Sequence, residues 1–120
     1  MNNNQNNLLD EITESSSLRD IQKYVCKALE LRGFNNQSPQ DKILLLVEEV
    51  GELAKAIRKS NTNIAIDPER INNYECVESE IADVLIVLIS LCNTLNVDIF
   101  KSFIEKEAIN VRRTWINAAK

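Results

Sequence analysis

Glycine and proline each occur only twice in the 120 residues of this chain. A fold made of β-strands needs turn residues at nearly every strand end, and glycine and proline are the main residues that provide them. Their scarcity therefore argues against an all-β fold. The length fits a single domain with a modest hydrophobic core, and 44% of the residues are available to build that core.

Apolar residues recur at helical spacing in four stretches, at about 18–32, 38–59, 74–95 and 98–115. Ser17 and Asp98 are suitable N-caps for the first and last stretches, and Ser38 followed by Pro39 suits the start of the second. Part of the third stretch is rich in β-branched residues and could form a strand. Its apolar pattern continues without a turn signal, however, which favours a helix. Four helices with short connections predict an all-α fold, an antiparallel four-helix bundle.

The N-terminal residues 1–17 begin with a run of asparagine and carry neither a basic segment nor an apolar segment of the kind found in signal peptides. We expect a mostly disordered tail there, followed by one domain over residues 18–116. The most apolar run, at 84–92, is shorter than the roughly 20 residues that a membrane span needs. We therefore expect no association with a membrane.

The chain contains no histidine, and its formal net charge is −4. The absence of histidine excludes histidine-dependent triads and histidine-bound zinc, so that catalysis must use carboxylates, Lys, Tyr, Cys or metal-bound water. The negative net charge argues against nucleic acid as a partner. An acidic protein that handles phosphates would need metal ions between the like charges. Cys26, Cys76 and Cys92 include no C-x-x-C pair, so we expect free thiols and a cytoplasmic location.

Glu48, Glu49 and Glu52 share one side of the second predicted helix, because residues advance by about 100° each. Like charges at this spacing repel by roughly 0.2–0.5 kcal/mol in an isolated helix. Helix stability alone does not favour such a cluster. Considered by itself, the cluster is also compatible with an ordinary solvated acidic face.

Glu80 and Asp83 are three residues apart in the third predicted helix, next to a segment that is apolar around nearly its whole circumference. Such helices are usually buried, and burial of an ionised carboxylate without a partner is costly. No lysine or arginine occurs between Arg70 and Lys101. Carboxylates from two helices can converge on a hard cation, and without histidine Mg²⁺ or Mn²⁺ is favoured over zinc.

Lys106, Asn110 and Arg113 follow one another at offsets of four and three in the fourth predicted helix. These offsets place the three donors on one helical face, where they could bind phosphates beside a metal site. An ordinary exposed face is the alternative interpretation.

These motifs together resemble those of the MazG-type, all-α nucleoside triphosphate pyrophosphohydrolases. LVEEVGEL at 46–53 resembles the E-E-x-x-E half of the family pattern, and EIADV at 80–84 resembles the E-x-x-D half. The end of the chain resembles the K-x-x-x-N-x-x-R-x-W ending of some members through Lys106, Asn110, Arg113 and Trp115. A lone E-E-x-x-E is common, whereas both halves in order, before an apolar helix, are fairly specific.

The resemblance implies hydrolysis of a nucleoside triphosphate to the monophosphate and pyrophosphate with Mg²⁺, or with Mn²⁺ in its place. House-cleaning of noncanonical nucleotides is a candidate role. Glu48 matches the residue that orients or deprotonates the attacking water. The positions that match metal ligands are Glu49, Glu52, Glu80 and Asp83. The positions that match substrate-binding residues are Lys106, Asn110 and Arg113. Members are homodimers or homotetramers, so oligomerisation would complete the bundle.

Three other interpretations stay open. The chain could be a phosphoribosyl-ATP pyrophosphohydrolase, which has a similar acidic motif, a non-catalytic helical regulatory module, or an unrelated acidic bundle. The sequence leaves open the base and sugar of the substrate and the number of metal ions.

Overall fold

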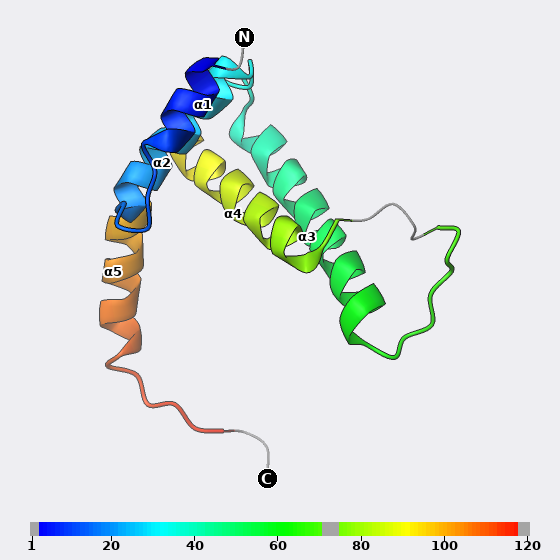
Figure 1. Cartoon of the computed structure of the whole chain (residues 1–120). Coiled ribbons are helices and arrows are strands. Elements are labelled where there is room, and N and C mark those ends of the chain that lie inside the picture. Colours follow the sequence, from blue (N-terminus) through cyan, green and yellow to red (C-terminus); the bar gives the residue numbers. More distant parts are fainter. Residues whose placement is uncertain (1–2, 71–74, 118–120) are drawn as a thin grey trace.

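The computed structural model describes residues 3–70 and 75–117. That part of the chain contains helices and no strand, which confirms the all-α prediction (Figure 1). The helices are α1 (Asn3–Asp10), α2 (Leu18–Leu31), α3 (Pro39–Asn61), α4 (Val77–Thr94) and α5 (Ile99–Asn110).

Two reciprocal capping boxes begin α2 and α3, where the sequence predicted caps. The Ser17 hydroxyl accepts the Asp20 N–H at 3.0 Å, and the Asp20 carboxylate accepts the Ser17 N–H at 2.9 Å. Ser38 and Asp41 repeat the arrangement at 3.1 and 2.9 Å. Each cap contributes about 1 kcal/mol to stability. After α2, Gly33 adopts φ +81°, a left-handed conformation that glycine allows at no steric cost.

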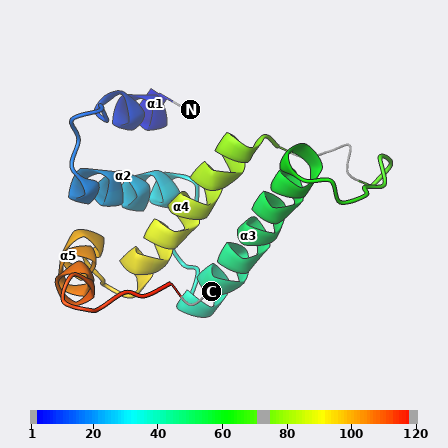
Figure 2. The same ribbon diagram turned by 90° about the horizontal axis from the view of Figure 1, so that it is seen from below.

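Helices α3 and α4 lie side by side and antiparallel, and α2 crosses α4 (Figures 1 and 2). The most deeply buried apolar side chains come from these three helices and are few: Val25, Ala28, Ala56 and Ile89. This small core packs α2, α3 and α4 together. It therefore positions the acidic motifs of α3 and α4 relative to each other.

The fourth predicted helix is shorter than the sequence suggested. Helix α5 ends at Asn110 rather than near residue 115, and a turn follows. In a continuing helix the Asn110 carbonyl would accept the N–H of residue 114. Here the indole Nε1 of Trp115 donates to that carbonyl at 3.0 Å, while the Arg113 N–H donates to it at 3.1 Å across a tighter turn. These contacts end the helix.

Residues 3–10, in the stretch where we expected a disordered tail, form α1. Leu8 and Ile12 are half-buried, and Arg32 Nε donates to Gln5 Oε1 at 3.0 Å. Leu8 in α1 and Ile12, two residues after its end, give this N-terminal segment an apolar side, and α1 contacts α2. The asparagine-rich composition concealed these two residues. Residues 1 and 2 lie outside the described residues. The division into a tail and a domain stays a prediction.

The four longer helices do not close around one core within a single chain. The radius of gyration is 17.7 Å, against about 13.6 Å for a compact chain of this length. Helix α5 bends by 99° from α4 and has no buried residue. Large apolar side chains stay exposed on three helices, including Leu44, Val47, Ile81, Leu85, Phe103 and Ile104. This surface is consistent with completion of the bundle by oligomerisation, which stays a prediction.

Over the described residues, no single helix combines the length and apolarity that a membrane span requires. The pair α4 and α5 reaches them only jointly, across the 99° bend.

Candidate metal centre

Three carboxylates meet where the first turns of α4 lie against the middle of α3. Glu49 comes from α3, and Glu80 and Asp83 come from one turn of α4. One oxygen of each lies within 4.8 Å of the other two. The spacing of three residues places Glu80 and Asp83 on the same side of α4, and the antiparallel packing brings Glu49 to face them. The arrangement offers a cation three oxygen ligands.

Glu80 is the most constrained of the three carboxylates. Its side chain is only 3% exposed, and its Oε2 atom has no hydrogen-bond partner in the described part of the chain. Burial raises the pKa of Glu80 above its usual value, and the charges of Asp83 and Glu52 raise it further. A buried carboxylate oxygen without a partner is costly to the fold. A divalent cation would relieve this cost.

The same charges act on Glu49. Burial raises the pKa of this carboxyl most, and repulsion from Asp83 and then Glu80 raises it further. Among the described residues, no lysine or arginine forms an ion pair with any of the three carboxylates. Among the residues that the structure describes, the centre therefore has a deficit of positive charge, which the charge of Lys55 offsets only in part at Glu80.

The other two predicted acidic residues take different positions. Glu52 is half-buried, lies outside the group of three, and faces Lys55 Nζ at 3.8 Å. Its charge still contributes to the raised pKa of Glu49 and of Glu80, so it stands at the border of the centre. Glu48 is exposed and lies outside the group of three. Of the five acidic residues, the structure brings three together, and their role as ligands stays a prediction.

The predicted phosphate-binding donors do not reach this centre within one chain. Helix α5 leads away from the α3–α4 pair (Figure 1). Lys106 is exposed near the end of α5, and Asn110 Nδ2 donates to Glu107 Oε2 at 2.8 Å. Arg113 follows the end of the helix and therefore does not share a helical face with the other two.

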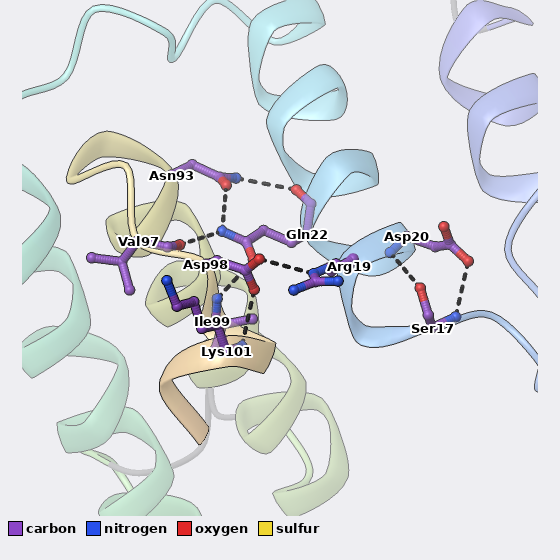
Figure 3. Close-up of polar contacts among 9 residues, drawn as sticks. All are labelled: Ser17, Arg19, Asp20, Gln22, Asn93, Val97, Asp98, Ile99 and Lys101. Carbon is purple, nitrogen blue, oxygen red and sulfur yellow. Dashed lines mark hydrogen bonds and ion pairs between the residues drawn. The ribbon is translucent and has the colours of Figure 1, made fainter. Parts of the chain in front are cut away.

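The direction of α5 is fixed by the side chain of Gln22 on α2 (Figure 3). Gln22 Nε2 donates to Asn93 Oδ1 at 3.0 Å and to the Val97 carbonyl at 2.7 Å. The N–H of Ile99, the first residue of α5, donates to Gln22 Oε1 at 3.1 Å. One glutamine thus binds the end of α4, the turn and the start of α5, and sequence analysis gave no signal for it.

Asp98 caps α5 as predicted, accepting the Lys101 N–H at 3.1 Å (Figure 3). It also accepts a hydrogen bond from Arg19 Nε at 2.8 Å, and the Arg19 guanidinium lies 5.1 Å from the centre of the Phe100 ring. Asn96 makes the turn with φ 56°, a left-handed conformation that asparagine tolerates. These contacts hold α5 against α2 rather than against α3.

Sequence analysis also missed a cavity of about 280 Å³ that extends from Glu49 between α2, α3 and α4. Lys42 lines it, is only 5% exposed, and donates from Nζ to Gln37 Oε1 at 2.7 Å. The sequence signal for this cavity was that Lys42 and Glu49 are seven residues apart. This spacing places them two turns apart on the same side of α3.

The comparisons with known proteins agree with one another. A family model for the MazG nucleotide pyrophosphohydrolase domain matches residues 37–109. A MazG-like pyrophosphohydrolase of cyanophage S-2L, solved with dGDP and three catalytic Mn²⁺ ions per active site, shares 27% identity over 88% of this chain and 89% of its own, with a TM-score of 0.62. The Bacillus-conserved MazG protein, a nucleotide pyrophosphohydrolase, shares 25% identity over 89% and 100%, with a TM-score of 0.62. No curated protein matches.

Proposed function

The chain belongs to the MazG nucleotide pyrophosphohydrolase family, and we propose that it cleaves nucleoside triphosphates between the α- and β-phosphates with Mg²⁺. The products would be a nucleoside monophosphate and pyrophosphate. The observation that carries the proposal is the buried Glu80 Oε2 without a partner, beside two further carboxylates within 4.8 Å. A role in house-cleaning of noncanonical nucleotides is a further prediction that the nucleotide panel below would address.

The donor set fits a hard divalent cation. Glu49, Glu80 and Asp83 would hold it, and we propose Glu52, which borders the centre, as a further ligand. Carboxylate oxygens suit Mg²⁺ and Mn²⁺, and Mn²⁺ occupies the site of the cyanophage relative. We therefore expect Mg²⁺ to be used and Mn²⁺ to replace it.

The proposed reaction gives a separate role to the bound cation, to Glu48 and to the phosphate-binding donors. The bound cation would neutralise phosphate charge and make water more acidic. Glu48 is exposed beside Glu49, so its carboxylate can accept the proton of the water that attacks phosphorus. As the new P–O bond forms, the bridging P–O bond breaks and pyrophosphate leaves with the electron pair. Lys106, Asn110 and Arg113 would bind the negative charge of the phosphates.

Because α5 leads away from the centre of its own chain, those donors need a second subunit to reach a metal centre. We infer a homodimer or homotetramer, which would also bury the apolar surface of α3, α4 and α5. The three cysteines are free thiols, which suits the cytoplasm.

The test is incubation of the full chain with Mg²⁺ and a panel of common and modified nucleotides, with detection of phosphate products by ³¹P NMR. We expect pyrophosphate, and Glu49→Gln should lose it while keeping its helical circular dichroism spectrum. Glu78→Gln is the matched control, since Glu78 is an exposed glutamate on α4 outside the centre. Orthophosphate in place of pyrophosphate would contradict the proposal. Turnover of phosphoribosyl-ATP alone would favour that alternative, and no turnover with intact metal binding would favour a regulatory module.

A further inference from the structure

Lys42 is a buried cation without an anionic partner. It lies in the first turns of α3, and among the described residues no carboxylate is within ion-pair distance of its Nζ. Its one hydrogen bond goes to the neutral amide oxygen of Gln37. Burial lowers the pKa of Lys42, and the nearby charge of Asp41 opposes this only in part. Lysine is rarely buried unless paired, so this position needs an explanation beyond packing.

Lys42 separates two neighbouring cavities of about 140 and 280 Å³, which share Leu29, Phe34, Gln37, Lys42 and Ser90. The larger cavity reaches Glu49 and so begins at the metal centre. Two turns of α3, about 10.5 Å along the helix axis, separate Glu49 from Lys42. That length is the scale of a nucleoside, so phosphates held at the centre would place the base near Lys42.

The walls of the larger cavity suit a flat, mostly apolar ring. Leu45, Ile86 and Val87 provide aliphatic surface, and Phe34 provides an aromatic ring at the end near Lys42. Apolar walls with a few polar groups at one end are typical of small-molecule sites. Stacking on an aromatic side chain binds every base alike, so any discrimination must come from the polar end.

At the polar end, Lys42 and Gln37 offer hydrogen-bond donors, and the Ser90 hydroxyl beside them can donate or accept. The Lys42 ammonium has three N–H donors and no acceptor, and one donor is used on Gln37 Oε1. This contact fixes the orientation of the Gln37 amide and leaves its Nε2 group as a second donor beside the first. The Lys42 ammonium and the Gln37 amide N–H groups therefore favour a ligand edge that carries acceptors.

Building on the proposed pyrophosphohydrolase activity, we propose that this cavity receives the nucleobase and that Lys42 and Gln37 select bases with a carbonyl oxygen at their outer edge. Guanine, hypoxanthine, uracil and thymine have such an oxygen. Adenine and cytosine carry an amino group there instead, which would place donor against donor. A lysine contact to the O6 and N7 acceptors of an oxopurine is a known specific pairing and discriminates by roughly five- to 150-fold.

The test compares ligands that differ at this edge. Binding of inosine and adenosine monophosphates, and of uridine and cytidine monophosphates, is measured by calorimetry on the full chain with MnCl₂. The same comparison is made for kcat/KM with inosine and adenosine triphosphates. We expect at least a fivefold preference for the carbonyl base in each pair. Lys42→Met should bring these ratios close to one, whereas Lys27→Met, a matched change of an exposed lysine on α2, should leave them unchanged.

Lys42→Met removes an unpaired buried charge and should fold at least as stably as the wild type, as checked by thermal unfolding. Should it fail to fold, Gln37→Glu serves instead, because it pairs Lys42 and removes one donor, and it should also lower the ratios.

The two proposals fail in different ways. Pyrophosphate release with equal kcat/KM for inosine and adenosine triphosphates, or a preference that Lys42→Met leaves intact, would overturn base selection and leave the activity standing. A binding preference that depends on Lys42, without release of pyrophosphate from any nucleotide, would support base selection and reject the activity.

Discussion

Replacement of Asp83 with asparagine should stabilise the protein without metal and remove most of its response to metal. Asp83 has an oxygen within 4.8 Å of an oxygen of Glu49 and of Glu80. Two unit charges at that distance repel by about 0.9 kcal/mol in water and about 3.5 kcal/mol at an effective dielectric constant of about 20. The half-exposed position of Asp83 favours the lower value. Asparagine keeps the shape and removes the charge, so we expect a gain of about 1 kcal/mol or more.

Metal binding, by contrast, should stabilise the wild type and have little effect on Asp83→Asn. A ligand that binds only the folded state at 100 times its Kd stabilises by about 2.7 kcal/mol. A chain of this length has an unfolding entropy of roughly 0.25 kcal/mol/K, so 1 kcal/mol corresponds to about 4 °C in Tm. Wild type should therefore gain about 10 °C with saturating Mn²⁺, and Asp83→Asn should start about 4 °C higher and gain little.

The assay is thermal unfolding followed by circular dichroism, in EDTA and in MnCl₂ at neutral pH. Glu78→Gln, which changes an exposed carboxylate on the same helix, should follow wild type in both buffers. An Asp83→Asn protein that melts lower in EDTA yet keeps the full gain with Mn²⁺ would refute the reasoning, because Asp83 would then stabilise the fold without binding metal.

Three further predictions concern pH, catalysis and the start of α5. The pKa of Glu80 is raised by burial, so the stability linked to its protonation is full below the ordinary value of 4.5 and is lost as pH rises through the raised value. In EDTA, the Tm advantage of Asp83→Asn should therefore grow as pH rises above that ordinary value. Glu48→Gln should lower kcat by about 10²-fold or more with little change in KM or in the Mn²⁺ gain, and wild-type kcat would reject its role as base. Gln22→Leu leaves the Asn93 amide and the Ile99 N–H without this partner, which should cost about 1–3 kcal/mol, or roughly 4–12 °C in Tm. An unchanged Tm would show that α5 is held by other contacts.

The helices that sequence analysis placed well are those whose signals are local. The starts of α2 and α3 depend on Ser17 and Ser38 with an acidic residue three positions later, and helical geometry alone sets those contacts. The end of α5 depends instead on the Trp115 indole, which reaches back five residues to a carbonyl. A periodic pattern cannot show that a side chain has replaced a backbone donor.

The metal centre likewise has a part that local spacing predicts and a part that it does not. Spacing put Glu80 and Asp83 on one side of a helix, and the antiparallel packing of two amphipathic helices then brought Glu49 to face them. The direction of α5 was not available from spacing, because it depends on Gln22, which is 77 residues away from its contact Ile99. We therefore propose that a second subunit brings the predicted phosphate-binding donors to the carboxylates.

Glu80 and Lys42 are buried charges of opposite sign on the α3–α4 pair, and neither has a partner of opposite charge within ion-pair distance among the described residues. A fold shaped by stability alone would place them in contact, because each unpaired buried charge costs several kcal/mol. They stand instead at the two ends of the stretch of α3 that carries the cavity, close to Glu49 at one end and at Gln37 at the other. A metal ion would neutralise the first, and the carbonyl oxygen of a base would accept a hydrogen bond from the second, so we propose that one metal-bound nucleotide serves both. Among the described residues, these two buried charged positions are thus where we expect a nucleotide to bind.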